Sequence, residues 1–241
     1  MRRPDARRVA IAAVLVAACT APLGAQQYIT DDAAITEYRA CQIQMWHGQR
    51  SSWVLPVCSP LRNIELSLGF IAVWKDGAQG HFEYVAQVKT LLRPLRPNSW
   101  GAGFVVGTGR DPAFTGTANQ TYTLYSYVPA SVSLSNDRLV LHENTGWLYA
   151  RAAGSGSNAF TWAARGDLRL RRMIAAVGEV YGAEGIGGTS AGAPAEFQAG
   201  LRSWLRRDHV ELDLTYGGAL RTGRRAAGWT LGLTLITPPF L

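Results

Sequence analysis

Eleven polar side chains that could bind a ligand or take part in catalysis recur between residues 65 and 213, within stretches that are otherwise apolar at every second position. Alternate residues of a β-strand point to opposite faces, so these side chains are expected on the face opposite to the apolar one. They combine carboxylates, cations, one imidazole and one amide: Glu65, Glu83, Lys89, His142, Asn144, Arg165, Asp167, Glu179, Arg202, Glu211 and Asp213. An isolated charge inside a protein costs several kcal/mol to desolvate. We therefore expect them to pair, either along a polar path for a solute or in a network that seals the interior.

His142 is the residue with most bearing on catalysis. It is the one histidine of four that falls in the middle of a predicted strand and on the polar face, with Asn144 two residues on and Glu179 or Ser133 as conceivable neighbours. A lipase or acyltransferase needs a nucleophile within reach of a base that a third group orients. A lone histidine more often bonds a neighbouring carboxylate. We therefore predict no enzyme and no cofactor, with a lipid-modifying barrel enzyme that uses His142 as base as an alternative.

The stretch from Ala195 to Gly217 shows the kind of element that would position these groups. Apolar and polar residues alternate up to the tight polar turn at 206–208, and the alternation resumes after it. The apolar positions are Phe197, Ala199, Leu201, Leu205, Val210, Leu212, Leu214 and Tyr216. The stretch is therefore a predicted β-hairpin with one apolar face and one face of charges and glycines, as in the wall of a membrane barrel.

The same pattern recurs along the chain and predicts an all-β protein. Ten strands follow Asn63, and two shorter ones, at 41–46 and 53–58, lie around His47, so we predict twelve strands, with ten as the alternative. Tight turns alternate with longer loops rich in Gly, Ser, Thr and Ala, and aromatic residues lie near many strand ends. This layout indicates an antiparallel transmembrane β-barrel with short periplasmic turns, longer outer loops and a polar lumen. A soluble β-sandwich is the alternative.

The N-terminus has the features of a secretion signal. Four arginines precede an apolar run from Val9 to Ala18 and a small-residue cleavage site at 23–25, so residues 1–25 are expected to be removed. Cys19 also fits the pattern of a lipidated cysteine. Residues 26–40 are predicted to form a periplasmic lead-in and residues 41–241 the barrel, with residues 41–62 as a strand pair that could instead lie beneath it.

The charge of the chain argues against nucleic acid as a partner. The formal net charge is +7, and the predicted signal, with four arginines against Asp5, accounts for +3 of it. The remaining basic residues are spread along the chain without a stripe or arm of the kind that binds phosphates. The expected partners are outer-membrane lipid and the barrel assembly machinery, which would recognise the C-terminal strand through Phe240.

Cys41 and Cys58 are the two cysteines that remain after the predicted signal. In an exported protein an even pair indicates a disulfide, and two strands joined by a short turn would bring these thiols together. A metal site is the weaker alternative, because two thiols without a CxxC spacing or a neighbouring histidine pair do not supply enough zinc ligands.

Several short motifs resemble a family of exported bacterial barrels related to the transporter-like proteins of the meta pathway of phenol degradation. They include Thr30-Asp31-Asp32-Ala33, Cys41 to Trp46, Pro56-Val57-Cys58, Asn63 to Gly69, His142 to Trp147, Gly178 to Gly182 and Gly200-Leu201-Arg202. The resemblance implies an outer-membrane location and passage of small molecules, aromatic ones among them. One residue departs from the barrel pattern: Glu143 falls on the lipid-facing side, which indicates either a strand that begins lower or a β-bulge.

Three hypotheses follow from the sequence. The first is a channel or passive transporter of the outer membrane for small solutes. The second is a structural or interaction barrel that its lumenal salt-bridge network seals. The third is the lipid-modifying enzyme.

Overall fold

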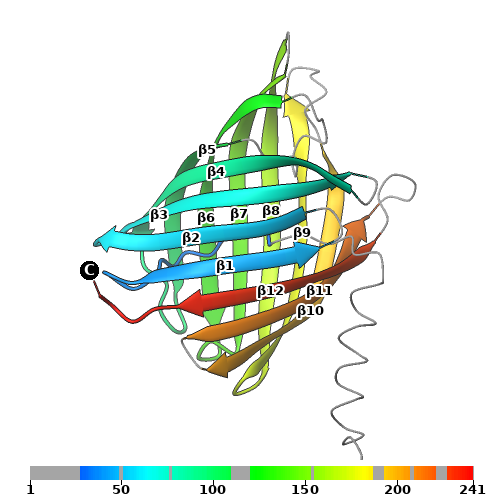
Figure 1. Ribbon diagram of the computed structural model, residues 1–241. Helices are drawn as coiled ribbons and strands as arrows, with labels where there is room; N and C mark the ends of the chain where they lie inside the picture. The colour runs from blue at the N-terminus through cyan, green and yellow to red at the C-terminus, as the bar shows by residue number, and fades with distance from the viewer. Residues whose placement is uncertain are drawn as a thin grey trace, which may run out of the picture.

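The described part of the chain forms twelve strands that close into one antiparallel β-barrel (Figure 1). The computed structural model describes residues 28–48, 51–75, 78–109, 120–152, 155–186, 193–206, 209–220 and 227–240, and only the backbone of residues 73–75, 78–83, 120–121, 152, 155 and 193–194. The strands are β1 (Cys41–Gly48), β2 (Ser51–Leu61), β3 (Ile64–Lys75), β4 (Ala78–Arg93), β5 (Trp100–Gly109), β6 (Gln120–Leu134), β7 (Leu139–Ala152), β8 (Ser155–Arg171), β9 (Ile174–Ile186), β10 (Ala193–Arg206), β11 (Val210–Ala219) and β12 (Gly228–Ile236). In these residues no helix is long and apolar enough to cross a membrane.

The barrel closes between its first and last strands. Each strand pairs with its neighbour in the chain, and β1 pairs with β12 from Gln42 opposite Ile236 to Gly48 opposite Thr230. The prediction of twelve strands is confirmed, and the alternative of ten is wrong. Residues 41–62 are therefore part of the wall, as β1 and β2, and do not lie beneath it.

Cys41 and Cys58 face each other across β1 and β2 and form a disulfide. The predicted disulfide is thus confirmed. The bond fastens the start of the barrel wall at the point where the chain leaves residues 28–40 and enters β1. The backbone NH of Thr237, just after β12, donates to the carbonyl of Cys41, so the two ends of the barrel chain meet there.

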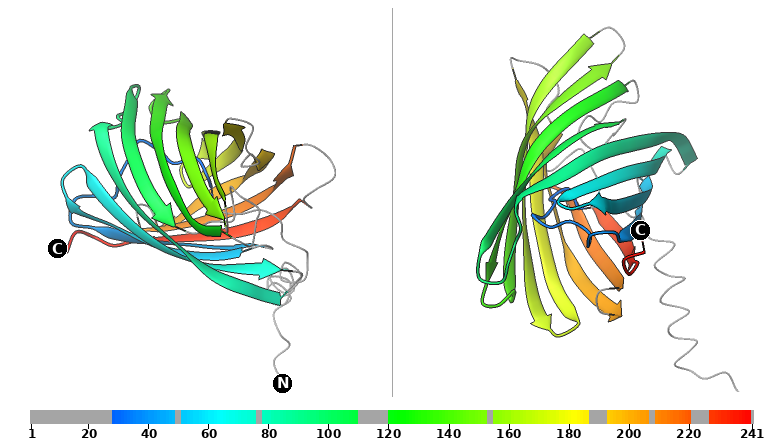
Figure 2. Two further views of the ribbon diagram at one scale, coloured as in Figure 1. Left: turned by 90° about the horizontal axis from the view of Figure 1, so that it is seen from above. Right: turned by 90° about the vertical axis from the view of Figure 1, so that its left-hand side faces the viewer.

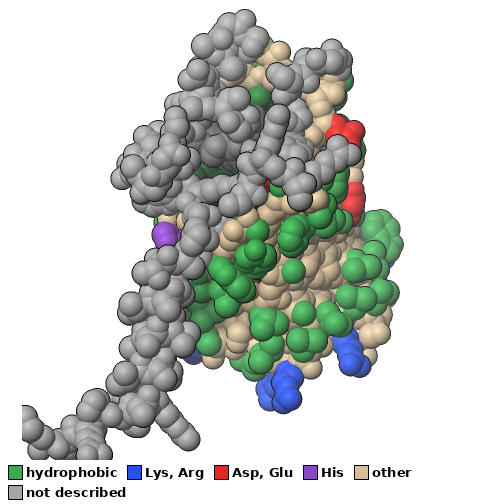
Figure 3. Space-filling view, turned by 90° about the vertical axis from the view of Figure 1, so that its right-hand side faces the viewer, with side chains coloured by type: hydrophobic (Ala, Val, Ile, Leu, Met, Phe, Trp, Pro, Cys, Tyr) green, Lys and Arg blue, Asp and Glu red, His purple; other side chains and the backbone are tan. Residues whose placement is uncertain are grey.

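The outer surface of the barrel is apolar. Leu201, Leu214 and Leu231 lie side by side on β10, β11 and β12, and their exposed fractions are 52%, 48% and 51%. In a β-sandwich these leucines would be buried between two sheets, so the soluble alternative is wrong. Apolar side chains spread over the wall in Figure 3, with Lys and Arg side chains at its lower rim. A surface of this kind suits hydrocarbon, with cations near the lipid headgroups.

Tight turns join the strands at the barrel end that carries the C-terminus. Asn63, Asn98, Ser135, Asn136 and Asp137 adopt positive φ angles there, between 52° and 63°. Asn, Asp and to a lesser degree Ser tolerate this left-handed conformation because their short side chains bond the local backbone. The longest gaps between consecutive strands, from Gly109 to Gln120 and from Ala219 to Gly228, fall at the opposite end. The connection from β7 to β8 is short, because β7 continues to Ala152 and β8 begins at Ser155.

Glu143 lies on the outer face of β7, where it is exposed and accepts a hydrogen bond from the hydroxyl of Thr145. The pairing of β7 with β8 runs without interruption from Leu139 to Ala152. The β-bulge interpretation of Glu143 is therefore wrong, and this carboxylate belongs to the lipid-facing surface.

Residues 28–40 run through the inside of the barrel, where Figure 2 (left) shows the chain before β1 crossing the ring of strands. The backbone NH of Ala33 donates to Ser131 Oγ at 2.8 Å, and Lys89 Nζ lies 2.8 Å from Asp31 Oδ1. The expectation of a periplasmic lead-in is corrected for these residues, because they are bonded to inward-facing side chains of the wall. The predicted signal peptide and Cys19 lie outside the described residues.

Candidate functional site

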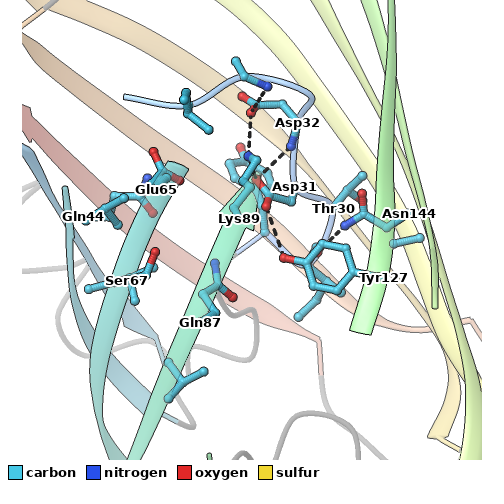
Figure 4. Close-up of a pocket in the computed structure, with 18 of the residues that line it drawn as sticks. Thr30, Asp31, Asp32, Gln44, Glu65, Ser67, Gln87, Lys89, Tyr127 and Asn144 are labelled. Atoms are coloured by element: carbon cyan, nitrogen blue, oxygen red, sulfur yellow. Dashed lines mark hydrogen bonds and ion pairs between the residues drawn. The ribbon is translucent and has the colours of Figure 1, made fainter. Parts of the chain in front are cut away.

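The site is a cavity of about 520 Å³ inside the barrel, between residues 28–40 and the inner faces of the wall strands. Figure 4 shows its charged part, with Lys89 and Tyr127 reaching from β4 and β6 toward Asp31 and Asp32. Polar and apolar side chains both line it, and they come from strands far apart in the sequence. The cavity therefore exists because the strands close into a ring and because the N-terminal segment enters that ring.

Lys89 fastens the N-terminal segment to β4. Its side chain is 2% exposed, and its Nζ lies 2.8 Å from Asp31 Oδ1 and 3.2 Å from Asp32 Oδ1. The hydroxyl of Tyr127 donates to the other oxygen of Asp31 at 3.1 Å. Burial alone would raise the pKa of Asp32, but the positive charge of Lys89, aided by His142 and Arg165, outweighs it and holds that pKa well below its ordinary value. Asp32 is therefore ionised and paired at neutral pH.

Glu65 fastens the same segment to β3. Its Oε2 accepts hydrogen bonds from the backbone NH of Thr36 at 2.6 Å and from the hydroxyl of Thr36 at 2.8 Å. Glu65 lies opposite Lys89 in the register of β3 and β4, and it is 5% exposed. Hydrogen bonds to an ionised acceptor are among the stronger ones in proteins. Glu65 and Lys89 thus attach residues 31–36 to one side of the barrel.

Glu179 attaches the segment to the opposite side. Its two oxygens accept hydrogen bonds from the backbone NH groups of Ile29, at 3.0 Å, and Thr30, at 2.8 Å, and the amide of Gln198 donates to it at 2.9 Å. The amide of Asn144 donates to the carbonyl of Ile29 at 3.2 Å. The segment therefore crosses the lumen with bonds to the wall at both sides.

Arg202 is the centre of a second charged cluster. Its Nε lies 2.8 Å from Asp213 Oδ1 and 2.9 Å from Glu211 Oε1, and its Nη1 lies 3.5 Å from Asp167 Oδ2. Arg165 joins the cluster through Asp167, with 3.1 Å between Nε and Oδ1, and also donates to the carbonyl of Thr30 at 2.7 Å. Two cations thus pair with three carboxylates inside the wall, where an unpaired charge would be costly.

Tyr28 links this cluster to the N-terminal segment. Its hydroxyl donates to Asp213 Oδ1 at 3.3 Å, and its ring lies 5.3 Å from the guanidinium carbons of both Arg165 and Arg202. Burial raises the pKa of the Tyr28 phenol above its ordinary value, so it stays neutral and available as a donor. Cation–π contacts of this kind add attraction between the segment and the wall.

His142 has a hydroxyl and a carboxylate as neighbours. Its Nδ1 lies 2.8 Å from Ser131 Oγ, and its Nε2 lies 3.7 Å from Asp167 Oδ2. Ser131 and not Ser133 is therefore the serine beside it. Ser131 is 1% exposed and also accepts the backbone NH of Ala33, so this pair holds the N-terminal segment.

Part of the lumen wall formed by β1 to β4 is apolar, so the expectation of a polar lumen is only partly right. Trp46, Trp53, Leu55, Val57, Ile71 and Val85 form one buried cluster inside the barrel, with Tyr125 packed against it. These strands carry apolar residues on both faces, as in the run from Phe70 to Trp74. On these strands the alternation of apolar and polar residues therefore does not show which face points to the lumen and which to lipid.

The structure brings most of the predicted site residues together inside the barrel. Those whose side chains it describes in or beside the lumen are Glu65, Lys89, His142, Asn144, Arg165, Asp167, Glu179, Arg202, Glu211 and Asp213. Glu83 pairs with Ile71 on the backbone, but its side chain lies outside the described residues. Sequence reasoning missed Tyr28, Thr36, Ser131 and Gln198, and did not link Asp31 and Asp32 to Lys89. The adjacent carboxylates at 31–32, in a segment predicted to be a periplasmic lead-in, were the available signal.

Comparison with known proteins gives the family. The model of the family described as uncharacterised conserved protein UCP029691 matches residues 10–237, which is nearly the whole chain. The chain belongs to this family. No curated protein matches it.

Solved structures of outer-membrane barrels share the fold. The NanC porin covers 81% of this chain and 98% of its own, with 11% sequence identity and a TM-score of 0.58. The COG4313 outer membrane channel from Pseudomonas putida F1 covers 88% of this chain and 98% of its own, with 7% identity and a TM-score of 0.53. At such identities the likeness shows the fold alone. That fold, with the apolar outer wall, identifies an outer-membrane barrel of the Gram-negative type, which confirms the predicted location.

The prediction that the chain is not an enzyme is corrected. LpxR from Salmonella typhimurium also matches, covering 81% of this chain and 99% of its own at 9% identity and a TM-score of 0.42. A shared fold does not by itself decide whether a protein is an enzyme, so the fold gives no ground for excluding catalysis. The likeness is too distant to carry an activity to this chain. Among the described residues, no group of three or more His, Cys, Asp or Glu side chains could hold a metal ion.

Proposed function

We propose that this protein is an outer-membrane channel that passes small organic solutes through the lumenal cavity, and that residues 28–40 narrow the path. The observation that carries the proposal is the cavity of about 520 Å³ between this segment and the inner face of the barrel wall. Its volume lies in the range of small-molecule sites, and it combines apolar walls with a few polar groups, as such sites do. The fold shared with a porin and with an outer-membrane channel supports a channel in general terms.

The solute class rests on two arguments. Trp46, Trp53 and Tyr125 give the cavity aromatic walls, which suit the apolar body of an organic molecule. The resemblance of the sequence to transporter-like proteins of the meta pathway of phenol degradation favours aromatic molecules among the solutes.

A sealed structural barrel is the second candidate, and one observation favours it. The N-terminal segment is bonded to Glu179 on one side of the lumen and to Lys89 and Glu65 on the other. Bonds at both sides would make the segment a permanent part of the wall. In the channel, the same bonds set how far and how often the segment moves aside.

Liposome swelling with neutral solutes of increasing size tests the channel. The wild type should admit small solutes, and the double variant Asp31→Asn/Asp32→Asn, which loses the ion pairs to Lys89, should admit larger ones. Glu143→Gln is the matched control, because it removes a carboxylate from the outer face only. A folded wild type and double variant that both exclude every solute would favour the sealed barrel and overturn the channel.

A further inference from the structure

The cavity contains polar atoms that have no partner among the described residues. Ser67 is 6% exposed, and its hydroxyl has no hydrogen-bond partner among the described residues. Glu65 lies two positions earlier on the same face of β3, and both of its bonds to Thr36 use the oxygen Oε2. Within the described chain, the oxygen Oε1 of Glu65 is left for a ligand. A buried polar group without a partner is unfavourable, so the Ser67 hydroxyl, beside a carboxylate oxygen that accepts no bond from the described chain, points to a bound molecule that satisfies it.

The surroundings of these two groups define an elongated site. In the strand register Ser67 lies between Val57 of β2 and Gln87 of β4, and Figure 4 shows Ser67 and Gln87 on neighbouring strands, with Glu65 further along β3. Farther along the strands, Ile71 pairs with Trp53 in the apolar cluster. The cavity is thus acidic at one end of β3 and apolar at the other.

The charge of the lining favours a cation. Five carboxylates and three cationic side chains line the cavity. The three cations are already engaged: Lys89 with Asp31 and Asp32, Arg165 with Asp167 and Thr30, and Arg202 with Glu211 and Asp213. Glu65, by contrast, has hydrogen bonds from Thr36 and no ion pair within 4.0 Å among the described residues. An anion would meet this carboxylate without a free cation to offset it.

We propose that the cavity binds a small amphipathic amine, whose ammonium group donates to Glu65 Oε1 and Ser67 Oγ and whose apolar body lies along Val57 and Leu55 toward Trp53. An ammonium group has three donors and no acceptor, which suits a carboxylate oxygen beside a free hydroxyl. A neutral alcohol supplies one donor and no charge. This inference deepens the proposed function, because it names the solute class for the same cavity.

Isothermal titration of the purified full-length barrel in detergent tests the inference with three probes of similar shape: 2-phenylethylamine, 2-phenylethanol and 3-phenylpropionate. The wild type should bind the amine at least about tenfold more tightly than the alcohol, since hydrogen bonds to charged groups contribute about 1.5–3 kcal/mol. The carboxylate should bind most weakly. Equal affinity for amine and alcohol, or tighter binding of the carboxylate, would overturn the inference.

Glu65→Gln should remove the preference for the amine, because it keeps the shape of the side chain and its bonds with Thr36 while deleting the charge. Ser67→Ala should weaken amine binding several-fold with little effect on the fold, and it serves as the test if the Glu65 variant does not fold. Glu143→Gln should bind like the wild type. Unchanged amine affinity in folded Glu65→Gln or in Ser67→Ala would contradict the proposed contacts.

Swelling assays on the same preparations separate this inference from the channel. A barrel that admits small solutes but shows no preference for the amine overturns the amine site alone. A barrel that admits no solute, even in the double variant Asp31→Asn/Asp32→Asn, overturns the channel. The titrations then decide the amine site by themselves.

Discussion

Replacing Lys89 by Met removes the cation that fastens Asp31 and Asp32 to β4, and it should detach residues 28–40 from that side of the lumen. Lys89 is 2% exposed, and both ion pairs are at or below 3.2 Å. Removing one partner of a buried pair costs about 3–5 kcal/mol. Because the side chains of Asp31 and Asp32 are 26% and 41% exposed, water screens part of this interaction, and the low end, about 3 kcal/mol, applies.

That free energy corresponds to a shift of about a hundredfold in the equilibrium between the attached and detached segment. Ala33 is fully buried in the attached state, so a cysteine at this position reports on detachment through its rate of labelling by a maleimide at pH 7. Ala33→Cys with Lys89→Met should label about a hundredfold faster than Ala33→Cys alone. Cys41 and Cys58 are joined in the disulfide and do not compete for the reagent.

Arg172→Met is the matched control, because Arg172 is an exposed cation of the turn between β8 and β9. It should leave the labelling rate unchanged. Equal labelling rates with and without the Lys89→Met substitution in a folded barrel would refute the view that the ion pairs hold the segment.

Three further outcomes are expected. Glu179→Gln weakens two charge-assisted hydrogen bonds to the backbone of residues 29 and 30, so the labelling rate of Ala33→Cys should rise about tenfold. An unchanged rate would mean that Asn144 and Arg165 alone hold the segment on this side of the lumen. The pKa of Asp32 lies below its ordinary value, so its ion pair stabilises attachment fully above about pH 4 and loses this effect as the pH falls further. Conductance should therefore rise as the pH falls below about 4, and a conductance that stays constant there would contradict the assignment. Glu143→Leu should raise the free energy of unfolding in lipid by about 1 kcal/mol, because a carboxylate facing hydrocarbon is unfavourable. Urea unfolding measures this change, and a loss of stability would indicate that Glu143 contacts a partner.

Strand count, closure and outer surface could be predicted because a membrane barrel places lipid on one face and the lumen on the other. Side chains alternate with a period of two, so residues such as Leu201 and Arg202 fall on opposite faces whatever the strands around them do. The disulfide followed from the short turn between β1 and β2. These features depend on residues that lie close together in the sequence, so the sequence alone is enough to predict them.

The path of residues 28–40 could not be predicted, because its partners are remote. Asp31 lies 58 positions from Lys89, and Glu179 binds backbone NH groups that every residue other than proline offers. A short polar segment with two aspartates has the composition of a linker, and nothing near it in sequence shows that it meets charges in a lumen. The apolar part of the lumen wall was missed for a different reason: β3 has apolar side chains such as Phe70 and Ile71 on both faces, so the alternation of apolar and polar residues is lost there.

Single-channel current across a planar lipid bilayer tests the central claim most directly. The wild-type barrel should carry a small, steady current through the cavity beside residues 28–40, and Lys89→Met should carry a larger one as the segment detaches. Absence of current in both, with folded protein in the membrane, would contradict a path through the lumen and would identify the barrel as a sealed one.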